Sequence, residues 1–185
     1  MLVNRFSAKI NPFEGAKHRI INTTTIDTPM GLMHAAAIEQ GICLLDFADR
    51  DKLETQIIKL QKTFRAELQH GENHHLETLK LQLEEYFTQQ RKMFALPLIF
   101  SGTDFQNKSW KELQNIPYGT TSTYSQQAEN LGKPKAMRAI AAANANNRIL
   151  IIVPCHRVIA ANGDLAGYAG GLWRKKFLLH LEQCI

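Results

Sequence analysis

The chain has 185 residues, of which 44% are hydrophobic, so it is long enough for one large domain or two small ones with real cores. No stretch approaches the roughly 20 apolar residues of a membrane-spanning helix, and the first residues lack the apolar segment of a secretory signal. The three cysteines lie far apart with no CxxC pair, which argues against a disulfide framework and a structural zinc site. A reducing, cytoplasmic location is therefore expected, with no metal and no cofactor.

The net charge of +5 is unevenly distributed along the chain. Residues 1–103 hold 12 Lys and Arg against 12 Asp and Glu, whereas residues 104–185 hold 10 against 5. Such an asymmetry indicates that the basic half meets a polyanion, and nucleic acid is the commonest such partner. A solvated basic surface is the alternative explanation, because +5 is modest.

The first half predicts strands followed by helices. Residues 22–47 are rich in Thr, Ile and Leu and contain two turn signals, so two or three antiparallel strands are expected. Apolar residues then recur at helical spacing from Leu53 to Leu68, which predicts a helix. A second helix is predicted over residues 76–90.

A linker is expected next. The segment "FALPLIFSGTDF" contains a proline and a glycine, and it divides the chain into proposed domains of residues 1–95 and 96–185. Upstream, His70, His74 and His75 cluster in "HGENHH" without partner cysteines. We interpret this cluster as a polar surface loop rather than a metal site.

The second half begins with a predicted helix over residues 105–113, followed by a helix-turn-helix pattern. Thr123 and Gln126 fit the N-cap and third position of a capping box. Gly132 suits the end of that helix, and Pro134 suits the first position of the next one.

The sequence pattern of the second helix predicts a face made of small residues and two cationic side chains. It could press against a nucleic-acid backbone, although an alanine-rich helix also simply packs well. We expect Ala136, Ala139, Ile140 and Ala143 to face inward, and Lys135, Arg138 and Ala142 to face outward.

A reactive group is predicted at Cys155. The apolar run of residues 149–153 predicts a buried strand or extended segment, and Pro154 ends it. A thiol becomes nucleophilic when it ionises, and His156 and Arg157 supply basic groups beside it.

A histidine in such a site needs an acceptor for its other ring nitrogen. Glu182, on the last predicted helix, is one of five candidate carboxylates in this half. The alternative is that Cys155 is a small buried hydrophobe.

A resemblance to a known family favours the reactive cysteine. The segment "VPCHRVIAANGDLAGYAGGLWRKKFLLHLE" resembles the active-site region of the O6-alkylguanine-DNA alkyltransferases, also called methylated-DNA–protein-cysteine methyltransferases. The similarity extends upstream and covers residues 103–183, while "TPMG" and "EQGICLLDF" in the first half are similar but less specific. It implies an α/β two-domain fold: an N-terminal ribonuclease-H-like domain with a small antiparallel sheet, then a mostly helical winged helix-turn-helix domain.

The resemblance also implies an activity, the repair of DNA by a protein that acts once. Cys155 matches the thiolate that accepts the alkyl group from guanine O6 in DNA. His156 matches the base that takes the thiol proton through a water, and Glu182 the carboxylate that orients this histidine. Tyr124 matches the hydroxyl that bonds guanine N3 and helps to protonate the leaving base.

Further matches concern the DNA and the flipped nucleotide. The implied partner is a double-stranded DNA that contains O6-alkylguanine, bound by a monomer through its minor groove. Arg138 matches the side chain that fills the gap in the stack, and Asn147 the residue that joins the two halves of the site. The remaining predicted DNA contacts are Lys135, Ala136, Ala139, Ala142, Thr123 and Ser125.

The alkyl pocket is expected to involve Asn144, Tyr168, Val158, Ala169 and Leu150. The carbonyls of Cys155 and Val158 are implied acceptors for the guanine amino group, and the Ala169 N–H is an implied donor to O6. Leu150, at the pocket mouth by this resemblance, predicts a preference for methyl over bulky benzyl groups.

Two other functions stay open at this stage. One is a non-enzymatic binder of alkylated DNA on the same fold, although known relatives of that sort lack the cysteine. The other is a Cys-His hydrolase on an unrelated fold, which leaves the segments around Tyr124 and Arg138 unexplained.

Overall fold

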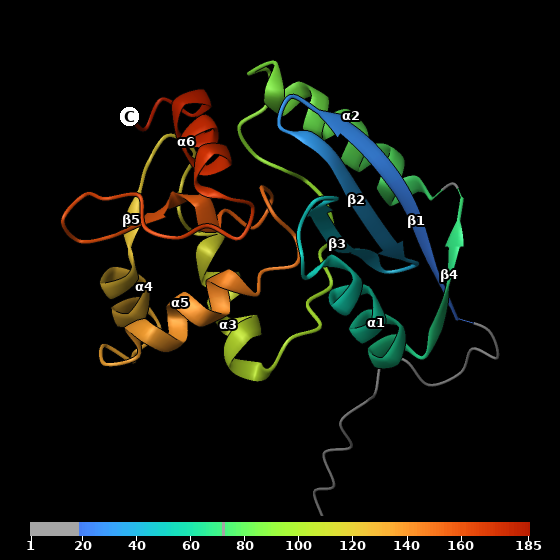
Figure 1. The fold of residues 1–185 in the computed structure, drawn as a ribbon, viewed down its shortest axis with the longest axis horizontal. Helices are drawn as coiled ribbons and strands as arrows, with labels where there is room; N and C mark the ends of the chain where they lie inside the picture. Colours follow the sequence, from blue (N-terminus) through green and yellow to red (C-terminus); the bar gives the residue numbers. More distant parts are fainter. Residues whose placement is uncertain (1–18, 72) are drawn as a thin grey trace, which may run out of the picture.

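The computed structural model describes residues 19–71 and 73–185, which form two adjoining halves (Figure 1). The first half contains a four-stranded sheet in the order β3-β2-β1-β4. Neighbours among the first three strands are antiparallel, as the sequence predicts. The strands are β1 (Arg19–Thr28), β2 (Gly31–Ile38), β3 (Gly41–Phe47) and β4 (Ala66–His70).

The fourth strand replaces the end of a predicted helix. Helix α1 (Leu53–Phe64) stops four residues before Leu68, because Arg65 adopts a left-handed conformation with φ 49°. The chain then pairs parallel to β1, with Ala66 opposite Arg19. Tertiary pairing outweighs the helical spacing of Leu68, so the sheet is mixed rather than wholly antiparallel.

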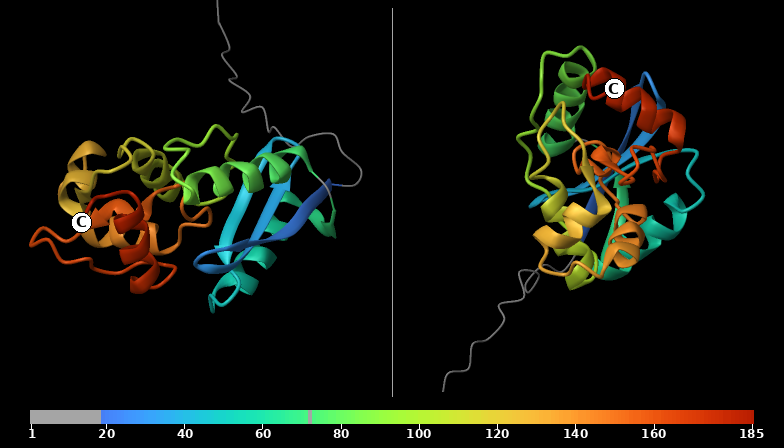
Figure 2. Two further views of the ribbon diagram at one scale, coloured as in Figure 1. Left: turned by 90° about the horizontal axis from the view of Figure 1, so that it is seen from above. Right: turned by 90° about the vertical axis from the view of Figure 1, so that its left-hand side faces the viewer.

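The two helices of this half cover opposite faces of the sheet (Figures 1 and 2). Successive side chains of a strand point to opposite faces. Ala36 and Ile38 therefore pack with α1, whereas Ala35 and Ala37 share a core with α2 (His74–Phe87) and the second half.

His74 and His75 open helix α2 and do not lie in a surface loop, which corrects the sequence interpretation. Asn73 caps the helix, its side chain accepting from the His75 N–H at 2.9 Å. The His75 ring is buried, with Nε2 3.0 Å from the carbonyl of Glu39. Within residues 19–71 and 73–185, no three His, Cys, Asp or Glu side chains gather as metal ligands would.

The second half is mostly helical, and its first helix confirms the predicted one over residues 105–113. Strands β5 and β6 pair in parallel. Among the described residues, no helix has the length and apolarity to cross a membrane. The elements are α3 (Asp104–Leu113), β5 (Ser122–Thr123), α4 (Tyr124–Asn130), α5 (Met137–Ala145), η1 (Cys155–Arg157), β6 (Val158–Ile159) and α6 (Leu172–Leu181).

The outer edge of β3 joins the two halves. Ile42 donates its N–H to the carbonyl of Pro97 in the connecting segment at 2.9 Å. Further along the same edge, Leu45 donates to Arg148 and accepts from Leu150, both at 2.8 Å. These bonds satisfy the backbone groups of an edge strand and fix the segment that leads to Cys155.

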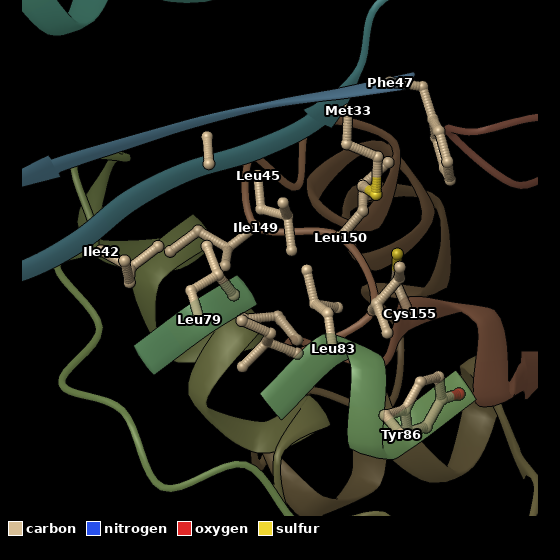
Figure 3. Close-up of a cluster of buried hydrophobic side chains, with 14 of the residues drawn as sticks. Met33, Ile42, Leu45, Phe47, Leu79, Leu83, Tyr86, Ile149, Leu150 and Cys155 are labelled. Atoms are coloured by element: carbon tan, nitrogen blue, oxygen red, sulfur yellow. The ribbon is translucent and has the colours of Figure 1, made fainter. Parts of the chain in front are cut away.

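One hydrophobic core spans both halves. Figure 3 shows Leu45 from β3, Leu79 and Leu83 from α2, and Ile149 and Leu150 from the second half in one cluster. Cys155 lies at the margin of this cluster. Side chains of the first half therefore help to fix the position of Cys155.

A glycine at position 41 is required by the close approach of the connecting segment. Its φ is +150°, and a Cβ there would overlap the carbonyl of Pro97. We expect Gly41→Ala to lower the free energy of unfolding by about 1–3 kcal/mol, measured by urea denaturation. Gly167→Ala is the control, since a Cβ at Gly167 meets nothing within 4 Å; equal losses in both variants would contradict the argument.

Candidate active site

The segment that leads to Cys155 consists of tight turns and is not a strand. Residues 149–153 are buried as predicted, but they fold back on themselves, with the Val153 N–H bonded to the Ile149 carbonyl at 3.0 Å. Ile151 has a φ of 72°, which an extended strand excludes. The strand prediction is wrong here because apolarity reports burial and does not report backbone shape.

The side chain of Asn147 holds these turns together. Its Oδ1 accepts from the Ile149 N–H at 3.0 Å, and its Nδ2 donates to the Val153 carbonyl at 2.9 Å. The same Nδ2 lies 3.2 Å from the sulfur of Cys155. Asn147 therefore links the end of α5 to the thiol and donates toward it.

The thiol of Cys155 is buried and un-ionised at neutral pH. Burial raises its pKa to about 11, against the lowering effects of the Asn147 hydrogen bond and of nearby Lys175 and Arg50. A thiol with this pKa needs a base to become a nucleophile.

A buried carboxylate lies at the centre of the charged groups around Cys155. Glu182 caps the end of α6 and accepts from His156 Nε2 at 3.0 Å, and from Arg157 Nε and Nη2 at 2.8 and 2.9 Å. Tyr86, at the end of α2, donates to the same carboxylate at 2.6 Å. Burial opposes ionisation, but the hydrogen bonds and charges of His156 and Arg157 lower the pKa of Glu182 to about 2.

The hydrogen bonds fix the tautomer of His156. An ionised carboxylate only accepts, so the proton lies on Nε2 and the lone pair on Nδ1. Within the described structure, Nδ1 is buried without a hydrogen-bond partner. Burial lowers the pKa of His156, so the imidazole is neutral and Nδ1 is available as a base.

A cavity of about 290 Å³ opens onto the thiol. Its walls are mostly apolar and come from α4, α5, η1 and the loop before α6. Of the predicted pocket residues, Asn144, Tyr168 and Ala169 lie on its walls, together with Tyr124, which was predicted to be catalytic. The full lining is Tyr124, Ala141, Asn144, Ala145, Cys155, Ala166, Gly167, Tyr168 and Ala169.

Leu150 and Val158 do not line the cavity. Leu150 is fully buried in the shared core, beneath β3, so its size does not limit the alkyl group and the expectation at the pocket mouth is corrected. Val158 is also fully buried, and its carbonyl accepts from Lys175 Nζ at 2.5 Å.

Two tyrosines of the cavity keep their protons. Burial raises the pKa of Tyr124, and the nearby Cys155 adds to this effect. Burial likewise raises the pKa of Tyr168, whose hydroxyl has no hydrogen-bond partner in the described structure. The Tyr124 phenol, which is only partly buried, can therefore donate a hydrogen bond to a group that enters the cavity.

The helix-turn-helix lies beside the cavity, with one correction. Thr123 caps α4 as predicted, accepting from the Gln126 N–H at 3.1 Å. Gly132 ends the helix with φ 67°. The second helix, α5, starts at Met137 rather than at Pro134, because residues 134–135 form a turn first.

The exposure of the residues in and before α5 differs from the prediction at two positions. Arg138, Lys135 and Ala142 are exposed as expected, and Ile140 and Ala143 are buried. Ala139 is exposed rather than inward, because it lies at the edge of the buried face, about 100° around the helix axis from Ile140. Ala136, also expected inward, is half-buried and precedes the helix as its N-cap. Ser125 lies 2.8 Å from Thr123, hydroxyl to hydroxyl, at the start of α4.

Three polar residues near the thiol, Arg50, Tyr86 and Lys175, were not identified as site residues from the sequence. Arg50 donates to Asp46 at 2.7 Å and to the carbonyls of Ala145 and Asn147 at 2.6 and 3.0 Å. Tyr86 and Lys175 are fully buried, and burial lowers the pKa of Lys175 to about 8. The helical spacing predicts that Tyr86 faces inward, as it does, but it gives no sign that the hydroxyl meets Glu182. A lysine in "RKK" is an ordinary surface signal.

Two family models match the chain. The ribonuclease-like domain of 6-O-methylguanine DNA methyltransferase matches residues 21–100, and the DNA binding domain of the same enzyme matches residues 104–184. These matches define a protein with a ribonuclease-like domain followed by a DNA-binding domain, which confirms the fold class expected from the sequence.

Individual relatives agree over most of the chain. The methylated-DNA–protein-cysteine methyltransferase of Methanosarcina barkeri is 43% identical over 161 residues, which cover 85% of this chain and 94% of that protein. The constitutive Bacillus subtilis protein of the same name is 42% identical over 161 residues, with coverages of 86% and 94%. The crystal structure of Mycobacterium tuberculosis OGT in complex with DNA superposes with a TM-score of 0.74 at 36% identity, covering 89% and 92% of the two chains. The chain belongs to the 6-O-methylguanine DNA methyltransferase family, as the sequence resemblance indicates.

The buried charge cluster predicts a pH-dependent stability. The pKa of Glu182 falls from 4.5 to about 2 on folding, so its contribution is complete above pH 4.5 and is lost as the pH falls through about 2. We expect Glu182→Gln to cost about 3–5 kcal/mol at pH 7, because Arg157 is left buried without its counter-ion. Urea denaturation at pH 7 and pH 3 measures this, and the gap between the variants should narrow at pH 3.

The control is Glu112→Gln, at a partly exposed carboxylate that accepts from the side-chain amides of Asn115 and Asn130. Its cost should stay below about 1 kcal/mol. A comparably small cost for Glu182→Gln would refute the central place of this carboxylate.

Proposed function

We propose that the chain is a single-turnover DNA repair enzyme, which transfers the methyl group of O6-methylguanine in double-stranded DNA to its own Cys155. O4-methylthymine is a second, less efficient substrate. The observation that carries this proposal is the thiol of Cys155 at an apolar cavity, with a neutral buried imidazole on the adjacent residue. Membership of the methyltransferase family supports it.

The proposed reaction begins with removal of the thiol proton. His156 takes the proton of Cys155 at Nδ1, relayed by a water, and Glu182 stabilises the imidazolium that forms. The thiolate then attacks the methyl carbon, so the S–C bond forms as the O6–C bond breaks. Tyr124 donates a proton to guanine N3 and becomes a phenolate. The proton that His156 took from the thiol then returns the phenolate to the neutral phenol, so the transfers add up to one proton moved from Cys155 to the guanine. Because a thioether is a poor leaving group, the protein is not regenerated.

Access to O6 requires that the nucleotide leave the duplex. In the proposal, α5 enters the minor groove, where its alanine face permits close approach and Arg138 fills the gap in the stack. Lys135, Thr123 and Ser125 contact the DNA backbone, so binding weakens with salt. Asn144, Tyr168, Ala169 and the carbonyl of Cys155 then hold the flipped base. The sequence resemblance also implied the carbonyl of Val158, but that group lies outside the cavity and accepts from Lys175. The remaining minor-groove contacts come from Ala136, Ala139 and Ala142.

The wider assignments belong to the same proposal. The chain acts as a monomer in the cytoplasm, associated with the nucleoid. Residues 1–95 form the supporting domain, and residues 96–185 form the domain that binds DNA and carries out the reaction.

The first test replaces the acceptor. We expect Cys155→Ala to abolish methyl transfer from a methylated duplex while DNA affinity changes less than about twofold, since the sulfur makes no contact with the DNA backbone. Intact-protein mass spectrometry measures the transfer, and fluorescence anisotropy measures the binding. Cys184→Ala, at a partly exposed thiol just beyond the C-terminal end of α6, is the control and should retain one methyl group per protein.

Other outcomes distinguish the alternatives. Binding without transfer by the unaltered protein supports a lesion-binding protein. Repeated release of product by one protein molecule supports a hydrolase. Either result contradicts the proposed single transfer.

The second test concerns the nucleotide flip. We expect Arg138→Ala to slow transfer from duplex DNA by about tenfold to a hundredfold, because the gap in the stack is left unfilled. Transfer from the free base O6-benzylguanine, which needs no flip, should stay within about twofold of the unaltered rate. Lys176→Ala, an exposed cation on α6, is the control. Equal slowing with both substrates would refute the assigned role.

A further inference from the structure

The helical second half does not supply all of the hydrogen-bond donors that surround the Glu182 carboxylate. Three of the four donors to Glu182 come from His156 and Arg157, but the fourth is the hydroxyl of Tyr86, 96 residues earlier in the chain. Tyr86 lies at the end of α2, in the ribonuclease-like half, and is fully buried. In Figure 3 its hydroxyl points away from the aliphatic side chains of the core.

Tyr86 and His156 bond the same carboxylate oxygen. Tyr86 Oη lies 2.6 Å from Glu182 Oε1, and His156 Nε2 lies 3.0 Å from that atom. Burial and the neighbouring carboxylate raise the pKa of Tyr86, so the phenol keeps its proton and donates it to Oε1. A hydrogen bond to an ionised acceptor is short and strong, so it competes directly with the histidine for electron density on this oxygen.

The ring of Tyr86 is held in place by other aromatic rings. Its centroid lies 5.3 Å from that of Phe94, 5.4 Å from Phe87 and 6.2 Å from Tyr118. The hydroxyl is therefore presented to Glu182 from a rigid site and costs little ordering when the reaction begins.

We propose that Tyr86 is a positioning residue for alkyl transfer, through which the ribonuclease-like half fixes the Glu182 carboxylate and keeps His156 a neutral base. The proposal rests on the proposed function of Cys155 and His156. A carboxylate without this donor would bind the imidazolium more tightly, and the histidine would hold a proton at higher pH. Tyr86 thus sets the lower pH limit of the reaction without touching the substrate.

Several other charged or titratable groups lie around the Glu182 carboxylate and the His156 imidazole, and replacing Tyr86 changes none of them. Arg157 compensates the carboxylate from η1, and Lys175 lowers the pKa of His156 from α6. The groups around the imidazole and the carboxylate, besides Tyr86, are Cys155, Arg157, Tyr168, Lys175, Tyr118 and Cys184.

The experiment compares Tyr86→Phe with Tyr118→Phe. Both variants keep the aromatic ring, but the Tyr118 hydroxyl donates to the backbone carbonyl of Leu181 at 3.0 Å and not to Glu182. Single-turnover methyl transfer is measured from pH 5.5 to 9 with a methylated duplex. We expect Tyr86→Phe to move the acid limb upward by about one pH unit, which is up to about a tenfold loss of rate at a given pH on that limb and little loss at pH 8.5. Tyr118→Phe should reproduce the unaltered profile.

A second measurement does not depend on transfer. NMR titration of His156 in the free protein should give a higher pKa in Tyr86→Phe than in the unaltered chain. If the unaltered protein transfers no methyl group, the proposed function fails, while this titration still tests the role of Tyr86. An unchanged His156 pKa, or an equal shift in Tyr118→Phe, overturns the inference.

A third variant covers the case in which Tyr86→Phe does not fold. Incorporation of 3-fluorotyrosine at position 86 keeps the ring and the hydrogen bond but makes the hydroxyl a stronger donor. The acid limb should then move downward, opposite to the effect of phenylalanine. A profile that does not move, or that moves upward, contradicts the proposal.

Discussion

The site depends on one buried carboxylate that carries more donors than a carboxylate usually finds. Burying Glu182 alone would cost several kcal/mol, and Arg157, His156 and Tyr86 offset that cost together. These donors come from η1 and α2, while the carboxylate ends α6. The same set of bonds therefore closes the helical half, docks it against the ribonuclease-like half and fixes the ring of the proposed base.

The backbone of β3 provides the second constraint. Its free edge pairs with residues 148–150, so the turns that hold Asn147 and Cys155 are anchored to the sheet. Arg50, just after this strand, bonds the carbonyls at the end of α5. The first half thus contributes more than support, because it determines where the exposed helix and the thiol stand relative to each other.

Burial governs the chemistry of the thiol. The same low dielectric that raises the pKa of Cys155 lowers that of His156, so both groups are uncharged at rest. Such a thiol resists adventitious alkylation and oxidation, because the thiolate is the reactive species. In the proposed reaction, a substrate must fill the cavity while the imidazole accepts the proton, which ties reactivity to binding.

The sequence by itself determined the local features. Residue type and spacing within a few positions were enough to predict the helix cap at Thr123, the antiparallel arrangement of the first three strands, the exposure of Arg138 and a reactive group at Cys155. The family resemblance then extended these local features to the whole fold. The tertiary structure alone decided that Leu150 joins the core, that residues 66–70 pair with β1, and that Tyr86 bonds Glu182. Each of these depends on which distant segment becomes the neighbour. Periodicity reports how much of a segment is buried and on which side, but it carries no information about the partner against which that side packs.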